Sequence, residues 1–455
     1  MSSLIIKNAS SIITMDNRVL KGKSIYIEDN RIVDIGKIRA EADIVIDGRK
    51  KVVMPGLINT HHHLYQTLTR AFFEDSSLFD WLKRFYRIWG KIGEKEVYLS
   101  AMIGICELLL SGCTTTSDML YIFPKGKKNL IDNEIEAAKE LGIRFHPCRG
   151  CMSIGESKGG LPPDNLVEDE KEILNDCERV IKKYNDKKKF SMLRIGLAPC
   201  SPFSVSQELL SKTIELSKKY NVRCHTHICE SLEEEKYCLE SYGKRPIDYI
   251  ASLGFIGENV WLAHCVYLNE KEIKKLADTK TSISYCPTSN MRLGTGIAPI
   301  YKLLLANVNV GIGVDGSASN DSSNMLAEVR ASFLLQRVKY GVKAMSPYKA
   351  LELATVNGAK VLGRKDIGRI SVGMAADLIC IDMKKICYSG ASHNPIGAIV
   401  LCANQGVDTS IINGKLVVHD GKIINKNFNR IMEEHEKVSM EIAKKELIAN
   451  RAIIA

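Results

Sequence analysis

A pair of histidines separated by one residue follows an apolar stretch directly, in the run MPGLINTHHHLYQ. Side chains two positions apart on an extended segment point to the same side, so His61 and His63 can converge on one ion while His62 points away. Imidazole is the commonest protein ligand for zinc and related divalent metals. Taken alone the triplet is ambiguous, because histidines without a metal are also common. A metal site therefore needs partners elsewhere in the chain.

Three later segments supply such partners. RCHTHICES contains His225, His227 and Glu230, WLAHCVYL contains His264, and VNVGIGVDGSASND contains Asp315. Each of these segments places polar residues where a buried, parallel-type strand would end, which is where barrel enzymes carry their chemistry. Such a coincidence is hard to obtain by chance, so the four segments together predict one shared site.

These motifs resemble the amidohydrolase superfamily, and in particular its aminohydrolase branch. The resemblance rests on the histidines after PGLIN, the H-x-x-E spacing, the lone histidine of AHC and the aspartate of VDGSASND, and it covers nearly the whole chain. HHHLYQTLTRA and RFHPCRGCMSIGESKGGLPPD are most similar to the group of 8-oxoguanine deaminases and hydroxyatrazine-type aminohydrolases. The resemblance implies a metal-dependent hydrolase that releases ammonia from an amino-substituted N-heterocycle, with 8-oxoguanine, converted to urate, as the leading substrate.

The resemblance assigns four metal ligands, which are His61, His63, His227 and Asp315. Three nitrogens and one oxygen leave a position open for water, as a catalytic site requires, and a bound divalent ion lowers the pKa of that water toward neutrality. In many members of the superfamily a lysine at the end of the fourth barrel strand bridges two metals. Here that strand, SMLRIGLAPCSPFSVS, ends without a lysine. We therefore expect one divalent ion, with zinc as the default and iron(II) as the alternative.

Proton transfer is the second requirement of a deamination, because a ring nitrogen and the leaving amine must both be protonated. Glu230, at the end of the H-x-x-E motif, can act as that shuttle. The resemblance makes His264 a partner that orients or deprotonates the metal-bound water together with Asp315. His225 is expected to orient a ligand, since the branch uses only the second histidine of the pair as a ligand. The acidic residues 233–235 are typical of a solvated surface.

Substrate contacts are less clearly marked. Gln66 resembles the glutamine that reads a purine carbonyl or ring nitrogen in guanine deaminases, because an amide both donates and accepts hydrogen bonds. Arg149, at the end of the expected third strand, would bind a carbonyl or enolate oxygen, and Trp89 or Tyr65 would stack on a planar ring. The run SKGGLPPD is rich in turn residues and is expected to close over the mouth of the barrel.

Several functions remain open on these motifs. A hydroxy-s-triazine N-alkylaminohydrolase keeps the same metal chemistry but expels an alkylamine, and a pterin or guanine deaminase differs only in the shape of its pocket. A non-catalytic assembly protein on the same fold belongs to a different class, because fold does not imply function. Such relatives lose metal ligands, whereas this chain retains all of them together with both proton-transfer residues.

Composition narrows the class of protein and its partners. A chain of 455 residues with 45% hydrophobic content predicts one barrel-sized domain and a smaller one. No stretch resembles a secretory signal or approaches the roughly 20 apolar residues of a membrane span, which favours a cytoplasmic protein. The net charge of +10 is spread over segments that mix acids and bases, so a small heterocycle, not a nucleic acid or a membrane, is the expected partner. A homo-oligomer is compatible with the sequence.

The cysteines do not point to a second metal site. The run PCRGC, which ends at Cys151, matches half of the motif of another zinc deaminase class. That class also needs an H-x-E upstream, and none precedes Cys148. We therefore expect no metal on Cys148 or Cys151, and the 14 scattered cysteines are typical of reduced thiols.

The order of elements predicts an α/β fold, a (β/α)8 TIM-type barrel with a small β-sandwich built from both chain ends. Short strands with turn signals fill residues 1–54 and return over 377–427. Between them, over 55–376, apolar strands alternate with helical patterns, as in a parallel barrel. Residues 428–455 predict a C-terminal helix. The eight barrel strands are expected to end near Asn59, Ser117, Cys148, Ala198, His225, Ala263, Tyr285 and Val314.

Overall fold

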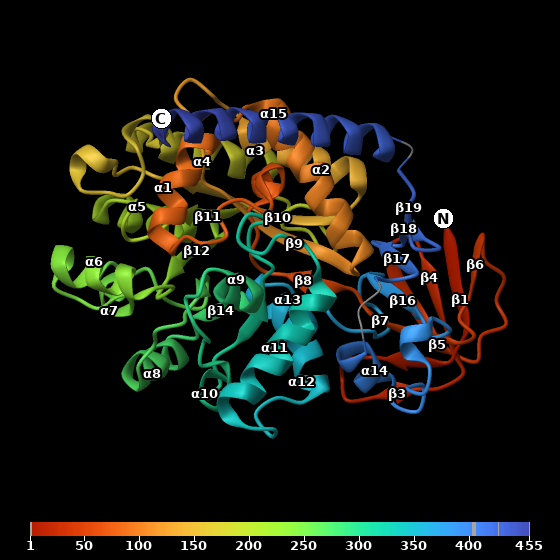
Figure 1. Ribbon diagram of the computed structural model, residues 1–455. Helices are drawn as coiled ribbons and strands as arrows, with labels where there is room; N and C mark the ends of the chain where they lie inside the picture. Colours follow the sequence, from red (N-terminus) through yellow and green to blue (C-terminus); the bar gives the residue numbers. More distant parts are fainter. Residues whose placement is uncertain (1, 403–405, 426, 455) are drawn as a thin grey trace.

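The computed structural model describes residues 2–402, 406–425 and 427–454, and its centre is a closed barrel of parallel strands (Figure 1). The strands follow one another around the barrel in chain order, and the last closes onto the first. They are β8 (Leu57–Asn59), β9 (Cys113–Leu120), β10 (Arg144–Cys151), β11 (Gly196–Pro199), β12 (Arg223–Ile228), β13 (Val260–His264), β14 (Ser282–Tyr285) and β15 (Val310–Ile312). The predicted TIM-type barrel is confirmed.

Five of the strands continue beyond their predicted ends, by one residue in β11 and β13 and by three in β9, β10 and β12. Strand β9 runs to Leu120, past Ser117, whose hydroxyl donates to the backbone carbonyl of His146 on β10 at 3.0 Å. Strand β10 likewise runs past Cys148 to Cys151. A buried serine or cysteine therefore does not mark a strand end here, since its polar atom has a partner on the neighbouring strand.

Helices surround the barrel and pack apolar faces against it. They are α1 (Leu78–Trp89), α2 (Glu94–Leu110), α3 (Leu130–Leu141), α4 (Glu170–Tyr184), α5 (Gln207–Tyr220), α6 (Leu232–Tyr242), α7 (Pro246–Ser252), α8 (Glu270–Asp278), α9 (Pro287–Arg292), α10 (Ile300–Leu305), α11 (Met325–Tyr340), α12 (Pro347–Glu352) and α13 (Gly358–Val361). Short turns include η1 (Leu64–Thr69), directly after the histidine triplet. Helix α3 ends at Gly142, whose φ of +72° and bond to the Ala138 carbonyl are typical of a glycine cap.

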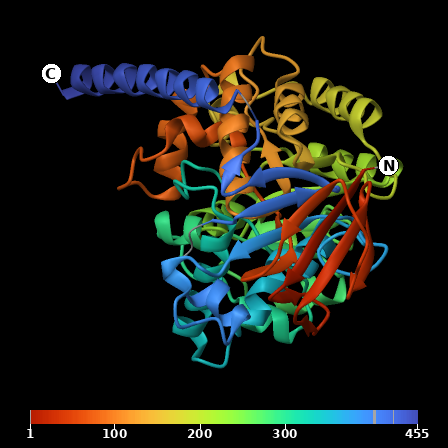
Figure 2. The same ribbon diagram turned by 90° about the vertical axis from the view of Figure 1, so that its right-hand side faces the viewer.

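Both chain ends build two further sheets beside the barrel, as predicted. One sheet holds β1 (Ser3–Ala9), β4 (Lys23–Glu28), β5 (Arg31–Gly36) and β6 (Ile44–Asp47). The other joins β2 (Ser11–Ile13), β3 (Val19–Leu20) and β7 (Lys51–Pro55) to β16 (Leu378–Asp382), β17 (Thr409–Ile412), β18 (Lys415–His419) and β19 (Lys422–Ile423). A separate apolar core between them includes Ile6, Ile25 and Leu378, so the sheets pack face to face (Figure 2).

Helix α15 (Phe428–Ile454) crosses the barrel and contacts α2 and η1. Its His435 lies 2.9 Å from the Thr67 hydroxyl, and the Ser439 hydroxyl donates to the Leu68 carbonyl at 2.9 Å. The end of the helix extends past the rest of the molecule (Figure 2). Across the described part of the chain, no helix combines the length and apolar character that crossing a membrane requires.

Candidate active site

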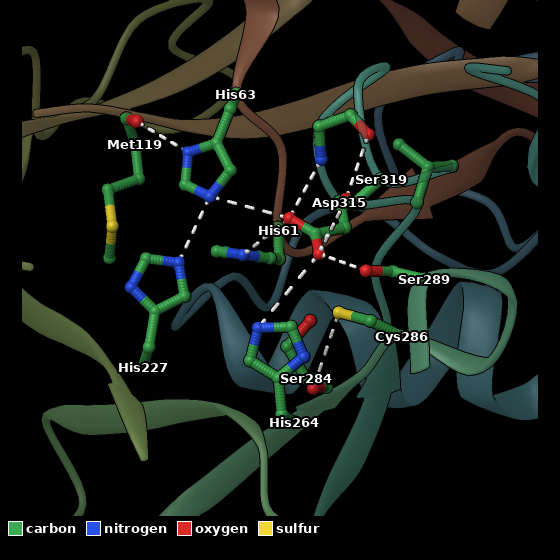
Figure 3. Close-up of polar contacts among 12 residues, drawn as sticks. His61, His63, Met119, His227, His264, Ser284, Cys286, Ser289, Asp315 and Ser319 are labelled. Atoms are coloured by element: carbon green, nitrogen blue, oxygen red, sulfur yellow. Dashed lines mark hydrogen bonds and ion pairs between the residues drawn. The ribbon is translucent and has the colours of Figure 1, made fainter. Parts of the chain in front are cut away.

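The four predicted ligands come from three barrel strands whose carboxyl ends meet (Figure 3). His61 and His63 follow β8, His227 lies in β12, and Asp315 follows β15. The Nε2 atoms of His61 and His63 lie 3.2 and 3.4 Å from Oδ1 of Asp315. Nε2 of His63 is 3.0 Å from Nε2 of His227. All four side chains are buried, so the fold brings the predicted ligands to one point inside the barrel mouth.

Hydrogen bonds behind the histidines determine which ring nitrogens face that point. Nδ1 of His63 donates to the backbone carbonyl of Met119 at 2.8 Å, and Nδ1 of His227 donates to that of Cys200 at 2.7 Å. A carbonyl only accepts, so each Nδ1 carries the proton and each Nε2 presents a lone pair. Two lone pairs facing each other at 3.0 Å repel, and a cation between them would convert that repulsion into two bonds. The donor set therefore fits a divalent metal.

Asp315 is ionised and firmly positioned. Its backbone has a φ of +64°, a conformation that non-glycine residues adopt rarely and that often marks a functional position. Its Oδ2 accepts from the hydroxyls of Ser289 and Ser319 at 2.6 and 3.2 Å. Burial opposes ionisation, yet contacts with His61 and His264 hold the pKa of Asp315 well below its usual range. A carboxylate with three imidazoles is a donor set that zinc and iron(II) both accept.

His225 lies behind the ligand cluster, in contact with His61. Nε2 of His225 is 2.7 Å from Nδ1 of His61, and its ring stacks on Trp261 with centroids 4.4 Å apart. Cys148 and Cys151 belong to none of the groups of described residues that are close enough to share a metal ion. The position of His225 behind His61 is compatible with its expected role of orienting a ligand.

Glu230 and His264 face each other at the edge of the ligand cluster. Nε2 of His264 lies 3.5 Å from Oε2 of Glu230 and 4.0 Å from Oδ2 of Asp315. Burial and the nearby charge of Asp315 raise the pKa of Glu230 well above its usual range. Burial lowers the pKa of His264 to about 4. A protonated carboxyl can donate a proton to a bound ring, and the neutral imidazole beside it can orient the groups that exchange protons.

Glu234 is a functional residue that sequence reasoning missed. The expectation that it is solvated is wrong, because its carboxylate is buried and accepts from the backbone N–H groups of Cys229 and Glu230 at 2.8 and 2.9 Å. These bonds hold the turn that carries Glu230. The available signal was the spacing from Ser231 to Glu234, since a serine followed three residues later by glutamate is typical of a helix start.

The cluster opens into a buried cavity whose wall is partly made by α1. The cavity is lined by His63, Gln66, Leu78, Trp81, Leu82, Tyr86, Tyr121, Cys200, Ser201, Phe203, His227, Glu230, His264, Leu293, Asp315 and Ser319. Gln66 lies in this wall, where its amide oxygen accepts from the Ala318 N–H at 3.3 Å. None of the described residues 157–164, which form the SKGGLPPD loop, lines the cavity. Helix α1 contributes side chains to its wall instead.

Arg149 does not line the cavity, so the prediction that it contacts the substrate is wrong. Its guanidinium donates to Glu168 and Asp176 at 2.6 and 2.7 Å and lies over the ring of Phe123, 3.6 Å from the centroid. Successive side chains of a strand face opposite sides, and this position of β10 faces the surrounding helix α4, which carries Asp176. Sequence position identified the strand but not the side to which the arginine points.

Trp89 is also displaced from its expected role. Its indole donates to the Thr69 hydroxyl at 3.2 Å, and its ring stacks on Phe85 with centroids 4.7 Å apart, outside the cavity. Trp81 and Tyr86 line the cavity instead. Helical periodicity could not have separated these residues, because Trp89 follows Tyr86 by three positions and Leu82 by seven and so lies on the same side of α1, further along the helix.

Comparison with known proteins assigns the family. A model of the amidohydrolase family matches residues 52–417, which is most of the chain. The chain belongs to this family. The superfamily expected from the histidine, glutamate and aspartate motifs is thereby confirmed, and the protein is a hydrolase of the amidohydrolase family.

Individual relatives agree with the expected subgroup. The chain is 41% identical to the 8-oxoguanine deaminase of Pseudomonas aeruginosa, over 96% of this chain and 98% of that protein. It is 34% identical to the hydroxydechloroatrazine ethylaminohydrolase of a Pseudomonas species, over 89% of this chain and 88% of that one. Among solved structures, an Arthrobacter aurescens atrazine chlorohydrolase complexed with zinc matches with a TM-score of 0.91 at 32% identity, covering 96% of this chain and 100% of that one. These relatives act on more than one kind of heterocycle.

Proposed function

We propose that this amidohydrolase is a metal-dependent hydrolytic deaminase that converts 8-oxoguanine and water into urate and ammonia. One observation carries the deaminase assignment: three imidazole Nε2 atoms and the Asp315 carboxylate converge beside Glu230 and His264 in the wall of one buried cavity. The choice of 8-oxoguanine is supported by the 41% identity with the P. aeruginosa enzyme over nearly the full length of both chains.

The site residues divide the chemistry between them. When bound, a divalent ion on the three imidazoles and Asp315 would supply Lewis acidity and lower the pKa of the attacking water. The Asn290 amide donates to Nδ1 of His264, so Nε2 carries the ring proton and can orient that water by donating to it, while the Asp315 carboxylate, 4.0 Å from Nε2, can accept the proton of the water. Glu230 then protonates the ring nitrogen next to the amino-bearing carbon. The carbon–nitrogen bond to the amine then breaks and a carbonyl forms on that carbon. Of the two protons of the attacking water, one goes to the amine, which leaves as ammonia, and the other restores the carboxyl of Glu230.

Two neighbouring groups prepare these residues for the reaction. The side-chain amide of Asn290 lies 3.2 Å from Nδ1 of His264 and orients its ring. The Glu234 carboxylate holds the backbone of Glu230. Both contacts are made inside the protein, so they preserve the geometry without occupying the cavity.

A second candidate is the removal of an alkylamine from a hydroxy-s-triazine. It is favoured by the match to a triazine-converting enzyme and uses the same ligands and proton-transfer residues with a different leaving group. Pterin and guanine deamination also fit a site of this chemistry. A non-catalytic assembly protein is disfavoured, because all four ligands and both proton-transfer residues are present and converge.

A substrate screen with the purified protein tests the proposal. The candidates are 8-oxoguanine, guanine, a pterin and an N-alkyl hydroxytriazine, with released ammonia or alkylamine as the readout. We expect kcat/KM for 8-oxoguanine to exceed that for guanine at least about tenfold, which corresponds to about 1.4 kcal/mol of transition-state binding. A screen in which another heterocycle is best would reject 8-oxoguanine and retain the deaminase chemistry. Absence of turnover by metal-loaded protein on every compound would favour the non-catalytic alternative.

A further inference from the structure

We propose that Trp81 and Tyr86 donate hydrogen bonds to ring carbonyl oxygens of the substrate and thereby select an oxidised purine over its less oxidised analogue. This inference rests on the proposed deaminase function and specifies how the same cavity recognises its substrate. Both residues stand on α1 and line the cavity, whereas the metal ligands stand on the barrel strands. The two groups therefore form different walls of one site.

The polar atoms of both side chains are buried and lack a partner. Trp81 is 3% exposed and Tyr86 is 1% exposed, and neither the indole Nε1 nor the tyrosine hydroxyl has a hydrogen-bond partner among the described residues. Leaving a buried polar group unpaired costs about 1–3 kcal/mol. A ligand that offers an acceptor at each atom removes that cost, so the cavity wall favours ligands with acceptors in these positions.

The chemistry of the two groups specifies what they bind. An indole N–H donates and cannot accept, so Trp81 requires a carbonyl oxygen or an unprotonated ring nitrogen. Burial raises the pKa of Tyr86 well above its usual range, so its hydroxyl keeps its proton and can also donate. The remaining wall near them includes Leu78 and Leu82, which provide no competing polar group. Two donors in an otherwise apolar wall match a planar ring with two carbonyl groups.

This pattern separates 8-oxoguanine from guanine. Both compounds carry the carbonyl at C6 and the amino group that leaves, but only 8-oxoguanine carries a second carbonyl, at C8. Guanine offers no oxygen at C8, and its nearest acceptor, N7, is an atom of the ring itself and does not project beyond it, so a donor placed to reach the C8 oxygen loses that partner. A site built to hydrogen-bond a group discriminates strongly against the analogue that lacks it, because the buried partner is then unsatisfied.

Gln66 does not account for the same selectivity by itself. Its amide oxygen accepts from the Ala318 N–H at 3.3 Å, and its amide nitrogen lies 3.4 Å from the Tyr65 hydroxyl. Both ends of this amide thus have partners inside the protein, unlike Trp81 and Tyr86. The two donors on α1 are the groups whose pairing depends on the ligand.

The test removes each hydrogen-bond donor while keeping an aromatic side chain at the position. Trp81→Phe, Tyr86→Phe and the double variant are compared with the parent enzyme on 8-oxoguanine and guanine. We expect at least one single variant, and the double variant, to lower the ratio of kcat/KM for 8-oxoguanine to that for guanine by about tenfold or more. Metal content and the thermal unfolding midpoint are measured for each variant, so that only folded, metal-loaded enzyme is compared.

Two matched controls lie outside the cavity. Trp89→Phe removes an indole donor from the same helix, but that donor is bound to Thr69. Tyr249→Phe removes a buried hydroxyl from α7, where the ring stacks on Tyr242 with centroids 4.0 Å apart. Both controls should leave the substrate ratio within about twofold of the parent, since neither residue lines the cavity and Trp89→Phe keeps an aromatic ring against Trp81 and Tyr86.

The outcomes distinguish this inference from the proposed function. A double variant that stays folded and keeps the parent ratio would falsify the role of Trp81 and Tyr86, even if the parent deaminates 8-oxoguanine well. If the parent does not turn over 8-oxoguanine, the proposed substrate is rejected. The variants are then compared on the best heterocycle of the screen and its analogue with one carbonyl fewer. An unchanged ratio there overturns the inference, and a tenfold fall supports it.

Discussion

Nδ1 of His61 lies 2.7 Å from Nε2 of His225, and this contact determines the tautomers of both rings. Nδ1 of His225 stands 2.9 Å from the Trp261 carbonyl, which can only accept, so that nitrogen carries the proton. Nε2 of His225 must then accept from Nδ1 of His61. Nε2 of His61 is left with a lone pair that faces Asp315, so His225 orients the ring of a candidate metal ligand.

Replacing His225 should therefore weaken metal binding. We expect His225→Ala to lower metal affinity about 10- to 100-fold, the usual effect of removing a group that orients a ligand. Competition with a chromogenic chelator measures the change. His225→Gln places an amide oxygen near the same acceptor position and should recover part of the affinity. Equal losses in both variants would indicate that His225 contributes packing only.

Asp315 should be essential for the metal and the activity. Elemental analysis of the parent protein is expected to find one divalent ion per chain, because no lysine lines the cavity to bridge a second ion. Asp315→Ala should lose both metal and turnover, since it removes the only carboxylate in the ligand set. Cys148→Ser and Cys151→Ser serve as controls with unchanged metal content. Two ions per chain would contradict the predicted stoichiometry.

Glu230→Gln should separate proton transfer from metal binding. The variant keeps the size and burial of the side chain but removes the carboxyl that lies 3.5 Å from His264. We expect unchanged metal content and a fall in kcat of about 10²-fold or more, the scale of general acid–base catalysis. Steady-state kinetics on metal-loaded enzyme measures the change in kcat. A variant with parental kcat would remove Glu230 from the mechanism.

Gly316 controls the position of the Gln66 amide. A Cβ added at Gly316 would lie 1.8 Å from the Gln66 side-chain oxygen, so Gly316→Ala must displace that amide. We expect Gly316→Ala and Gln66→Ala each to lower kcat/KM on the preferred heterocycle by about tenfold, the scale of one hydrogen bond. The double variant should be no worse than either single one, because both remove the same interaction. Additive losses would show that Gly316 acts elsewhere.

His435 should make the stability of the protein pH-dependent. Burial, together with the charge of Arg70, lowers the pKa of His435 to about 4, whereas an unfolded histidine titrates near 6.5. The folded state thus binds fewer protons between these values. The free energy of unfolding that depends on keeping His435 neutral is therefore fully present above about pH 6.5, and it is lost as the pH falls toward 4.

The variant His435→Gln isolates the effect of His435 titration on stability. Its free energy of unfolding should improve relative to the parent as the pH falls from 7 to 4, by up to about 3 kcal/mol. Urea unfolding of both proteins at several pH values measures the difference in the free energy of unfolding. The other buried histidines are present in both proteins, so their effects cancel in this difference. A pH-independent difference would mean that His435 does not titrate across this range.

The sequence was sufficient to predict the barrel and the convergence of the four candidate metal ligands. His61 and His63 stand two positions apart on an extended segment, and the chain places His227, His264 and Asp315 at the ends of three later barrel strands. In a parallel barrel all such ends meet at one mouth, so the spacing of strands along the chain already implies convergence. The two terminal sheets followed from the same kind of local pattern, because turn signals and alternating apolar residues are short-range properties.

Only the tertiary structure decided which residues complete the cavity. Arg149 stands in a strand that was predicted and Trp89 in a helix that was not, and neither lines the cavity, whereas Trp81 and Tyr86 do. The burial of Glu234 likewise depends on the turn of Glu230 folding back onto its carboxylate. A helix or strand is specified by neighbours in sequence, whereas the side that faces a ligand depends on how the element packs against distant ones.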